Sequence, residues 1–523
     1  MKKYFPLFWV FYLLCAFSAH AGEGRYTIPL TGGGWSLWLD KEASWQNDRL
    51  YLPHEITDLS LLPVNVPTGG WQTLSHNPDA VPVEVPGTVE EYLTVTDNPR
   101  PENFRGVSWW YRKITIPADQ QKKRFIIYFE SVRMRAEVYL DGKLVAYDLI
   151  GETPFHVDIT DEAKPGKEQL LAIRVTNPGG NFHWQDFDIM KWGEYNIPPS
   201  RSFTGIIGRV KLESVNPVFI SDIYMQNTPE LTKVNAILSF TNETSSSVKQ
   251  DVELIVNEKG NPDKVVFRQT LKAISFPAGN HEVTIPVNVP DAKLWDLSTP
   301  ELYTCNVLIK KGKKTLDQDK KDFGFRWFTV DGVGKDAVLR LNGRRIMLRS
   351  AISWGYFPVT GLIATTEMAE KQVRTAKSLG LNMLNFHRCI GSPVVLEKAD
   401  ELGLLYYEEP GSFHSANHDP FIRTIVNEKL KRMVYRDRSH PSLVIFNLIN
   451  EFGGPLSQDK ALVAKRMNDM REAHAIDPSR IMSFTSGWAG SEDKEEDSKA
   501  HMLPFDTTLY RKGWYDNHRA GGP

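Results

Sequence analysis

The chain has 523 residues, enough for about three to five domains. Its 62 lysines and arginines nearly balance 64 aspartates and glutamates, giving a formal net charge of −2. This balance excludes a strongly basic nucleic-acid-binding protein. With 41% hydrophobic and 24% charged residues, the composition also excludes a disordered chain and a multi-span membrane chain. The 14 tryptophans suit either sugar-stacking surfaces or β-sandwich cores, and composition alone favours cores.

Residues 1–21 have the pattern of a signal peptide. Lys2 and Lys3 supply positive charge, residues 4–17 form an uncharged and largely apolar run, and residues 19–21 read Ala-His-Ala, a small-x-small cleavage site. The apolar run is shorter than the roughly 20 residues that a membrane-spanning helix needs. We therefore expect an exported protein, periplasmic or secreted, without a membrane span.

Few cysteines accompany this export pattern. A lipoprotein signal is disfavoured because Leu14, rather than a small residue, precedes Cys15. The remaining Cys305 and Cys389 lie far apart in the sequence and form no disulfide framework. We expect both to be buried free thiols.

Residues 22–217 show short alternating runs separated by turn residues, which is typical of β-strands. The clearest strands are expected at residues 111–116, 138–140, 143–145 and 171–175. Asp141-Gly142 joins the second strand to the third as a tight hairpin, because both residues tolerate positive φ. The segment is predicted to be a jelly-roll β-sandwich.

Residues 218–328 continue with strands at a regular spacing, for which the pattern predicts an immunoglobulin-like β-sandwich. The strands expected here are residues 235–240, 251–256 and 282–287.

Residues 329–523 change to alternating strands and helices, the pattern of a parallel α/β barrel or a doubly wound sheet. Strands are expected at residues 345–352, 381–386, 404–407, 443–449 and 480–484, and helices at residues 366–379, 392–403, 421–435 and 461–475. No glycine-rich phosphate loop follows any of these strands, which disfavours nucleotide binding.

Polar residues end each of the five strands, where a barrel gathers its catalytic groups. The ends are Ser353-Trp354, residues 385–388, Glu408-Glu409, Asn450-Glu451 and residues 485–488. A carboxylate after a buried apolar strand is costly unless it is paired or used. Glu451 and the pair Glu408/Glu409 are therefore expected to face one pocket, as the two carboxylates of glycosidic cleavage do.

Each of these residues also has a purely structural interpretation. Glu451 could cap the next helix or pair with Arg388, and Glu408 and Glu409 precede Pro410-Gly411 as a solvated loop would. The remaining candidates that could serve packing alone are His387, Trp354 and Trp488.

Residues 439–451, Ser-His-Pro-Ser, an apolar strand and then Asn-Glu, resemble the acid/base signature of glycoside hydrolase family 2. Other stretches similar to that family follow in the same order. They are residues 109–112, 294–295, 300–303, 323–326, 341–343 and 399–405. The resemblance implies a jelly-roll sugar-binding domain, an immunoglobulin-like domain and a TIM barrel.

The resemblance also implies a retaining exo-β-glycosidase. Glu451 matches the general acid/base, and Asn450 matches the residue that binds the sugar 2-hydroxyl. A nucleophile carboxylate would lie roughly 5–5.5 Å from Glu451. The further substrate-binding candidates are His387, Arg388, Glu409, Trp354 and Trp488. We expect a carbohydrate substrate and no nucleic acid, cofactor or metal. A metal near Glu409, His414 and Glu451 has only a weak spacing signal, and the oligomeric state stays open.

Two departures from the family pattern stand out. The family's Arg-x-x-His near the second strand is replaced: Asn385 stands where the arginine is expected and His387 is displaced by one, which argues against the common galactosidase and glucuronidase pockets. About six strands are expected up to residues 501–504, so the barrel is predicted to be incomplete and its nucleophile to lie beyond residue 523.

Two alternatives remain. One is a non-catalytic carbohydrate-binding protein with a degenerate barrel. The other is an enzyme that uses Glu408, Glu409 or Asp506 as its second carboxylate. We expect the 523-residue chain alone to lack glycosidase activity.

Overall fold

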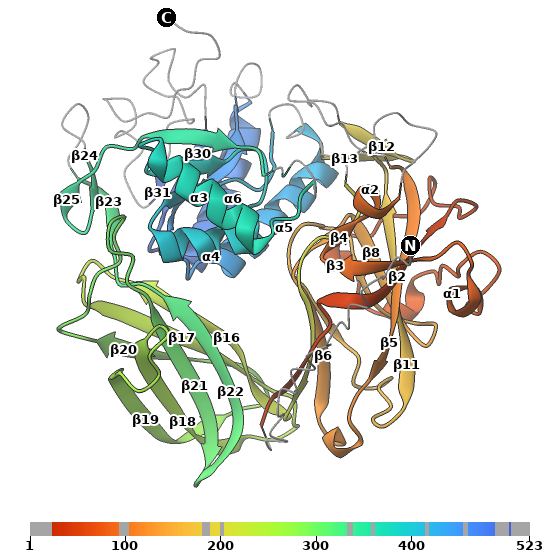
Figure 1. Ribbon diagram of the computed structural model, residues 1–523, viewed down its shortest axis with the longest axis horizontal. Coiled ribbons are helices and arrows are strands. Elements are labelled where there is room, and N and C mark those ends of the chain that lie inside the picture. Colours follow the sequence, from red (N-terminus) through yellow and green to blue (C-terminus); the bar gives the residue numbers. More distant parts are fainter. Residues whose placement is uncertain are drawn as a thin grey trace, which may run out of the picture.

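The computed structural model describes residues 24–93, 104–179, 189–198, 203–331, 338–355, 357, 361–413, 418–452, 459–486 and 502–503. These residues form two β-sandwiches and an α/β domain, which lies above the second sandwich and beside the first in the view of Figure 1. The expected fold classes are thereby confirmed. The predicted signal peptide, His414, Trp488 and Asp506 lie outside the described residues.

The first sandwich pairs a four-stranded sheet with a six-stranded sheet around one apolar core. The smaller sheet has the order β1 (Tyr26–Pro29), β15 (Val210–Val215), β6 (Arg124–Phe129) and β10 (Phe155–Asp158). The larger sheet has the order β3 (Val81–Val85), β2 (Gly32–Asp40), β5 (Gly106–Thr115), β11 (Glu168–Asn177), β8 (Arg135–Leu140) and β9 (Lys143–Asp148). Asp141 and Gly142 join β8 to β9 with φ of 49° and 85°, as the predicted hairpin requires.

Short elements complete this part of the chain. They are α1 (Thr73–His76), α2 (Val89–Tyr92), β4 (Gly87–Thr88), β7 (Val132–Arg133), β12 (Met190–Trp192), β13 (Tyr195–Ile197), β14 (Gly205–Ile206) and three 3₁₀ turns at Pro53–Glu55, Leu59–Leu61 and Ala118–Gln120.

The second sandwich has sheets of three and four strands that enclose an apolar core. Their orders are β16 (Val218–Asn227), β17 (Lys233–Asn242), β20 (Gly279–Asn288), and β19 (Val265–Phe276), β18 (Val248–Glu258), β21 (Tyr303–Lys311), β22 (Lys314–Phe323). All three expected strands lie within β17, β18 and β20. Cys305 is a buried free thiol as expected, whereas the free thiol of Cys389 is only half-buried.

The α/β domain begins with a small antiparallel sheet and continues as a sheet covered by four helices. The small sheet comprises β23 (Phe328–Asp331), β24 (Val338–Leu341) and β25 (Arg344–Arg345). The main elements are β26 (Ser350–Ser353), α3 (Thr366–Ser378), β27 (Met383–Phe386), α4 (Pro393–Leu402), β28 (Leu405–Glu408), α5 (Pro420–Asp437), β29 (Leu443–Asn450), α6 (Lys460–Ile476), β30 (Ile481–Ser486) and β31 (Met502–Leu503). None of the described helices is long and apolar enough to cross a membrane.

The helices follow their sequence signals closely. The predicted face of α3 is buried through Ala369, Val373 and Ala376. In α4, Pro393 occupies the first turn, where its missing N–H costs nothing. Gly403 ends α4 with a φ of 73°, a conformation that glycine adopts readily.

Two expected strands of this domain were wrong in detail. Residues 345–352 do not form one strand, because the tight turn at Asn342-Gly343 folds β25 back on β24 and a separate strand, β26, begins at Ser350. Strands β26 to β30 are parallel, as a barrel requires, but β31 pairs antiparallel with β30. All strands of a (β/α) barrel run parallel to their neighbours. Because β31 runs antiparallel to β30, it is not the sixth barrel strand that we expected.

Strand β29 is buried along all of its eight residues. Two arginine side chains donate hydrogen bonds to the backbone at the beginning of this strand. The Arg326 side chain donates to the carbonyl oxygens of Pro441 and Leu443 at 3.0 and 2.8 Å, and Arg480 Nε donates to Leu443 at 2.7 Å. Because Arg326 follows the second sandwich, this strand is tied directly to the domain below it.

The residues just before β29 are also anchored to helix α4. Asp400 accepts hydrogen bonds from the Ser442 N–H at 3.0 Å and contacts His440 Nδ1 at 2.5 Å. Trp295 of the second sandwich region donates its indole N–H to the Asp400 carbonyl at 2.8 Å. The His-Pro-Ser run therefore serves to place β29 rather than to contact the far end of the strand.

Glu408 ends β28 on the side of the sheet that helices α4 and α5 cover, and it is completely buried. The Gly391 N–H donates to Glu408 Oε1 at 2.7 Å, and Arg436 Nη2 lies 3.4 Å from the same oxygen. Arg436 also donates to both carboxylate oxygens of Asp437. The interpretation of Glu408 as part of a solvated loop was therefore wrong. Its carboxyl group and that of Asp437 share the buried guanidinium of Arg436 on the helix-covered side of the sheet.

Replacing Arg326 by methionine should destabilise the protein. The Pro441 carbonyl would lose its donor inside the protein, which costs about 1–3 kcal/mol. Calorimetric unfolding of the variant checks this, with Arg345→Met on the exposed strand β25 as the matched control. An Arg326→Met transition that coincides with that of the control would contradict the role given to this side chain.

Glu408→Gln should weaken the pH dependence of stability. Burial and the neighbouring Asp437 raise the pKa of Glu408 well above its usual range, against the opposing effect of Arg436. The folded protein thus holds a proton that the unfolded chain releases above about pH 4.5, so this group reduces stability as pH rises. Urea unfolding at pH 5 and pH 8 should show a larger loss in the wild type and in the exposed control Glu367→Gln than in Glu408→Gln. Equal losses in all three proteins would refute the assignment.

Candidate active site

The carboxyl ends of β26 to β30 lie at one edge of the sheet because these strands are parallel. This edge brings together most of the residues that the sequence singled out. They are Trp354 after β26, His387 and Arg388 after β27, Glu409 after β28, and Asn450 and Glu451 at the end of β29.

Asn450 and Glu451 are held by the last residue of the neighbouring strand, Ser486. Asn450 is fully buried and donates its amide Nδ2 to Ser486 Oγ at 2.9 Å. The Glu451 N–H donates to the Ser486 carbonyl at 2.7 Å. Glu451 has a φ of 51°, in the left-handed region that few non-glycine residues adopt, so the chain turns sharply there. This turn leaves Glu451 9% exposed at the end of a buried strand.

Arg388 connects these two residues from the opposite side. Its Nε donates to Asn450 Oδ1 at 2.8 Å, and its Nη2 lies 3.2 Å from Glu451 Oε2. The guanidinium lies over the ring of Phe413 at 3.8 Å and 5.7 Å from that of Trp354. The pairing of Glu451 with Arg388, which the sequence left open, is therefore present.

Glu409 lies beneath the same edge and is fully buried, so the prediction of a solvated loop was wrong for this residue too. Its Oε1 accepts from Ser486 Oγ at 2.7 Å, and its Oε2 accepts from the Arg388 N–H at 3.1 Å. Buried N–H and O–H groups need hydrogen-bond acceptors, and the Glu409 carboxylate accepts from one such group after β27 and from another at the end of β30. Glu409 thus orients the residues that carry the site.

Glu408 and Glu409 do not face one pocket as expected. Successive residues of a strand point to opposite faces, and Glu408 contacts Arg436 of α5 while Glu409 contacts Ser486 at the end of β30. Glu409 is linked to Glu451 through Ser486 and also through Arg388, which donates its backbone N–H to Glu409 and contacts Glu451 with its side chain.

His387 is buried, and the contacts of its ring are those of a packing residue. Its ring packs edge-on against Trp354, with centroids 4.6 Å apart. Its Nδ1 is 3.9 Å from Glu409 Oε1. The half-buried Trp354 also supports Arg388, so both residues shape the site from below.

Sequence reasoning placed Ser486 among the strand-end residues 485–488 but gave it no role in the site, and it missed Phe413 altogether. Phe413 carried no signal of this kind, since it lies in the loop after β28; it reaches the site through a bridge to Asn450 and its contact with Arg388.

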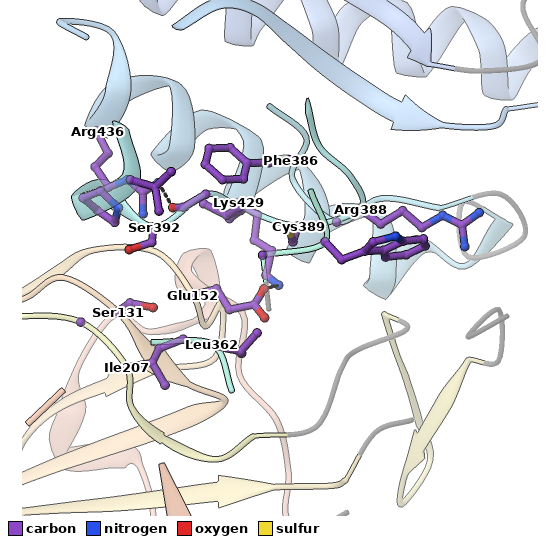
Figure 2. A pocket seen from close by; sticks show the side chains of 18 of the residues that line it. Ser131, Glu152, Ile207, Leu362, Phe386, Arg388, Cys389, Ser392, Lys429 and Arg436 are labelled. Atoms are coloured by element: carbon purple, nitrogen blue, oxygen red, sulfur yellow. Dashed lines mark hydrogen bonds and ion pairs between the residues drawn. The ribbon is translucent and has the colours of Figure 1, made fainter. Parts of the chain in front are cut away.

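A pocket of about 90 Å³ extends from this edge toward the first sandwich (Figure 2). Its lining includes Arg388, Trp354 and Phe413 from the strand edge. It also includes Glu152 and Lys429, which form an ion pair of 2.7 Å. In Figure 2 the Arg388 side chain extends away from that pair. Within the described part of the chain, no cluster of three or more histidine, cysteine or acidic residues is arranged to hold a metal ion.

Three models of one protein family match the chain in order. They are the glycosyl hydrolases family 2 sugar binding domain at residues 33–196, glycosyl hydrolases family 2 at residues 218–326, and the family 2 TIM barrel domain at residues 335–517.

Similar proteins come from several bacteria. A beta-galactosidase of Thermoanaerobacterium thermosulfurigenes is 30% identical over 377 residues, which cover 70% of this chain and 49% of that protein. A beta-glucuronidase of Formosa agariphila is 24% identical over 360 residues, covering 66% of this chain and 36% of that protein. The chain thus spans about half the length, or less, of these two relatives.

A solved structure shows the same fold. The crystal structure of a glycosyl hydrolase family 2 member from Bacteroides cellulosilyticus superposes with a TM-score of 0.72 at 20% identity, covering 90% of this chain and 58% of the other. The three matched domains, in this order and with this fold, place the chain in glycoside hydrolase family 2.

Proposed function

We propose that the protein containing this chain is an exported, retaining exo-β-glycosidase that hydrolyses O-glycosidic bonds of oligo- or polysaccharides. The observation that carries the proposal is the placement of the Glu451 carboxyl beside Asn450, at the strand edge where a barrel gathers catalytic groups. Relatives named beta-galactosidase and beta-glucuronidase support hydrolysis of a β-glycoside. The signal-peptide pattern at residues 1–21 supports export.

In this proposal Glu451 works twice in each turnover. It first gives its proton to the oxygen of the leaving group, while a second carboxylate attacks the anomeric carbon and forms a glycosyl ester. It then takes a proton from the water that cleaves this ester, so that the sugar is released with its configuration retained. Asn450 binds the 2-hydroxyl of the sugar during both steps.

We place the nucleophile outside the described residues. Glu408 points to the helix-covered side of the sheet, and both oxygens of Glu409 accept hydrogen bonds that hold Ser486 and Arg388. Neither carboxylate is arranged for attack beside Glu451. A screen of nitrophenyl glycosides on the full-length protein tests the function, and the absence of turnover on every sugar would favour a carbohydrate-binding protein instead.

Glu451→Gln in the full-length protein should lose far more activity on substrates with poor leaving groups than on activated aryl glycosides. Only the poor leaving groups need the proton, and general acid catalysis contributes about 10²–10⁴-fold. The measurement is kcat/KM across a series of leaving groups. Equal losses across that series would remove Glu451 from the acid role.

Asn450→Ala should lower kcat and kcat/KM together, because contacts to the 2-hydroxyl strengthen in the transition state. Steady-state kinetics of the full-length variant check this. The control for loss of an asparagine is Asn382→Ala, which lies just before β27 and so at the edge of the sheet away from Asn450. A change confined to KM would mean that Asn450 binds the ground state and the transition state equally, which would contradict a contact that strengthens in the transition state.

A further inference from the structure

The Arg388 side chain contacts Glu451, and its place is fixed from three directions. Glu409 accepts its backbone N–H at 3.1 Å, Phe413 lies under its guanidinium at 3.8 Å, and Asn450 accepts its Nε at 2.8 Å. Its φ of 57° lies in the left-handed region, which non-glycine residues occupy only when their surroundings impose it. A side chain held in this way is pre-organised toward its partner.

The contact with Glu451 has an electrostatic consequence. Arg388 Nη2 lies 3.2 Å from Glu451 Oε2, and the two side chains are only 11% and 12% exposed. At this depth water screens the attraction weakly. A cation so close favours the ionised carboxylate, whereas a general acid must be protonated when it meets its substrate. The same contact also fixes the direction in which the carboxyl points.

Other titratable groups lie near Glu451 on the neighbouring strand ends. Glu409, after β28, is connected to the Glu451 backbone through Ser486 of β30, and His387, after β27, lies 3.9 Å from Glu409. The negative charge of Glu409 acts on Glu451 in the opposite sense to that of Arg388. Glu409 accepts from Ser486 and from the backbone N–H of residue 388, and a substituted side chain keeps both donors, so a substitution of Arg388 tests the effect of the guanidinium.

We propose that Arg388 is a positioning residue for the general acid/base: it holds the Glu451 carboxyl and the Asn450 amide in register and sets the pH range in which Glu451 carries a proton. This inference rests on the proposed function, since it assigns Glu451 the acid role. It predicts an enzyme that works at lower pH than the same site without the guanidinium would.

The test compares Arg388→Met, Arg388→Lys and wild type in the full-length protein. The alkaline limb of the pH profile of kcat/KM, measured with a poor leaving group, reports the protonation of Glu451 in the free enzyme. Removing the cation should move this limb upward by about one pH unit or more, since a neighbouring opposite charge lowers a carboxyl pKa by about 1–3 units. Lysine keeps the charge and should leave the limb close to its wild-type position.

The control is Arg374→Met, which removes an exposed arginine of α3 that pairs with Glu370 on the helix surface. It should leave the pH profile unchanged. If Arg388→Met lowers activity equally at every pH, and lysine does not restore the profile, the residue only supports the fold and the proposal is wrong.

A second measurement separates this proposal from the proposed function. Infrared titration of the carboxyl stretch, with the Glu451→Gln spectrum subtracted, follows Glu451 without any substrate. An upward shift of its midpoint in Arg388→Met, in a protein that hydrolyses no glycoside, would support the coupling while refuting the glycosidase. An unchanged midpoint would refute the coupling, whatever the activity.

Discussion

The buried strand β29 is the constraint on which the site depends. Every one of its eight residues is buried, so it cannot shift without exposing apolar surface on one face or the other. Arg326 and Arg480 fix its beginning through backbone carbonyls, and Ser486 fixes its end through Asn450 and Glu451. The position of the Glu451 carboxyl is therefore set by contacts at both ends of β29. Those at its beginning include Arg326, which follows the second sandwich.

The two sandwiches contribute to the α/β domain through paired charges. Helix α5 joins the first sandwich through Lys429–Glu152 and Arg432–Asp148, each at 2.7 Å. The segment after α5 joins the second sandwich through Arg438–Asp222 at 2.6 Å. Breaking a buried pair by removing one partner leaves an uncompensated charge, so these contacts hold the three domains in one arrangement. Figure 1 shows α5 beside β13, which precedes the last strand of the first sandwich.

Glu408 and Glu409 show how a single step along a strand changes the role of a carboxyl group. Both are fully buried, yet Glu408 lies with Arg436 and Asp437 behind the sheet, and Glu409 lies with Ser486 at the edge that holds the site. Both accept from backbone N–H groups of the segment after β27, Glu408 from Gly391 and Glu409 from Arg388. The segment that carries Arg388 is thus clamped from both faces of the sheet.

The sequence by itself determined the fold classes, the helices and nearly all strands of the α/β domain, because strand alternation, helix periodicity and turn residues act locally. It also placed Asn450 and Glu451 at a strand end. Only the tertiary structure decided that Arg388 contacts both, that Phe413 lies under it, and that Glu408 and Glu409 face different ways. The burial of those two carboxylates depends on partners that are distant in sequence, such as Arg436 and Ser486, and no local pattern encodes those distances.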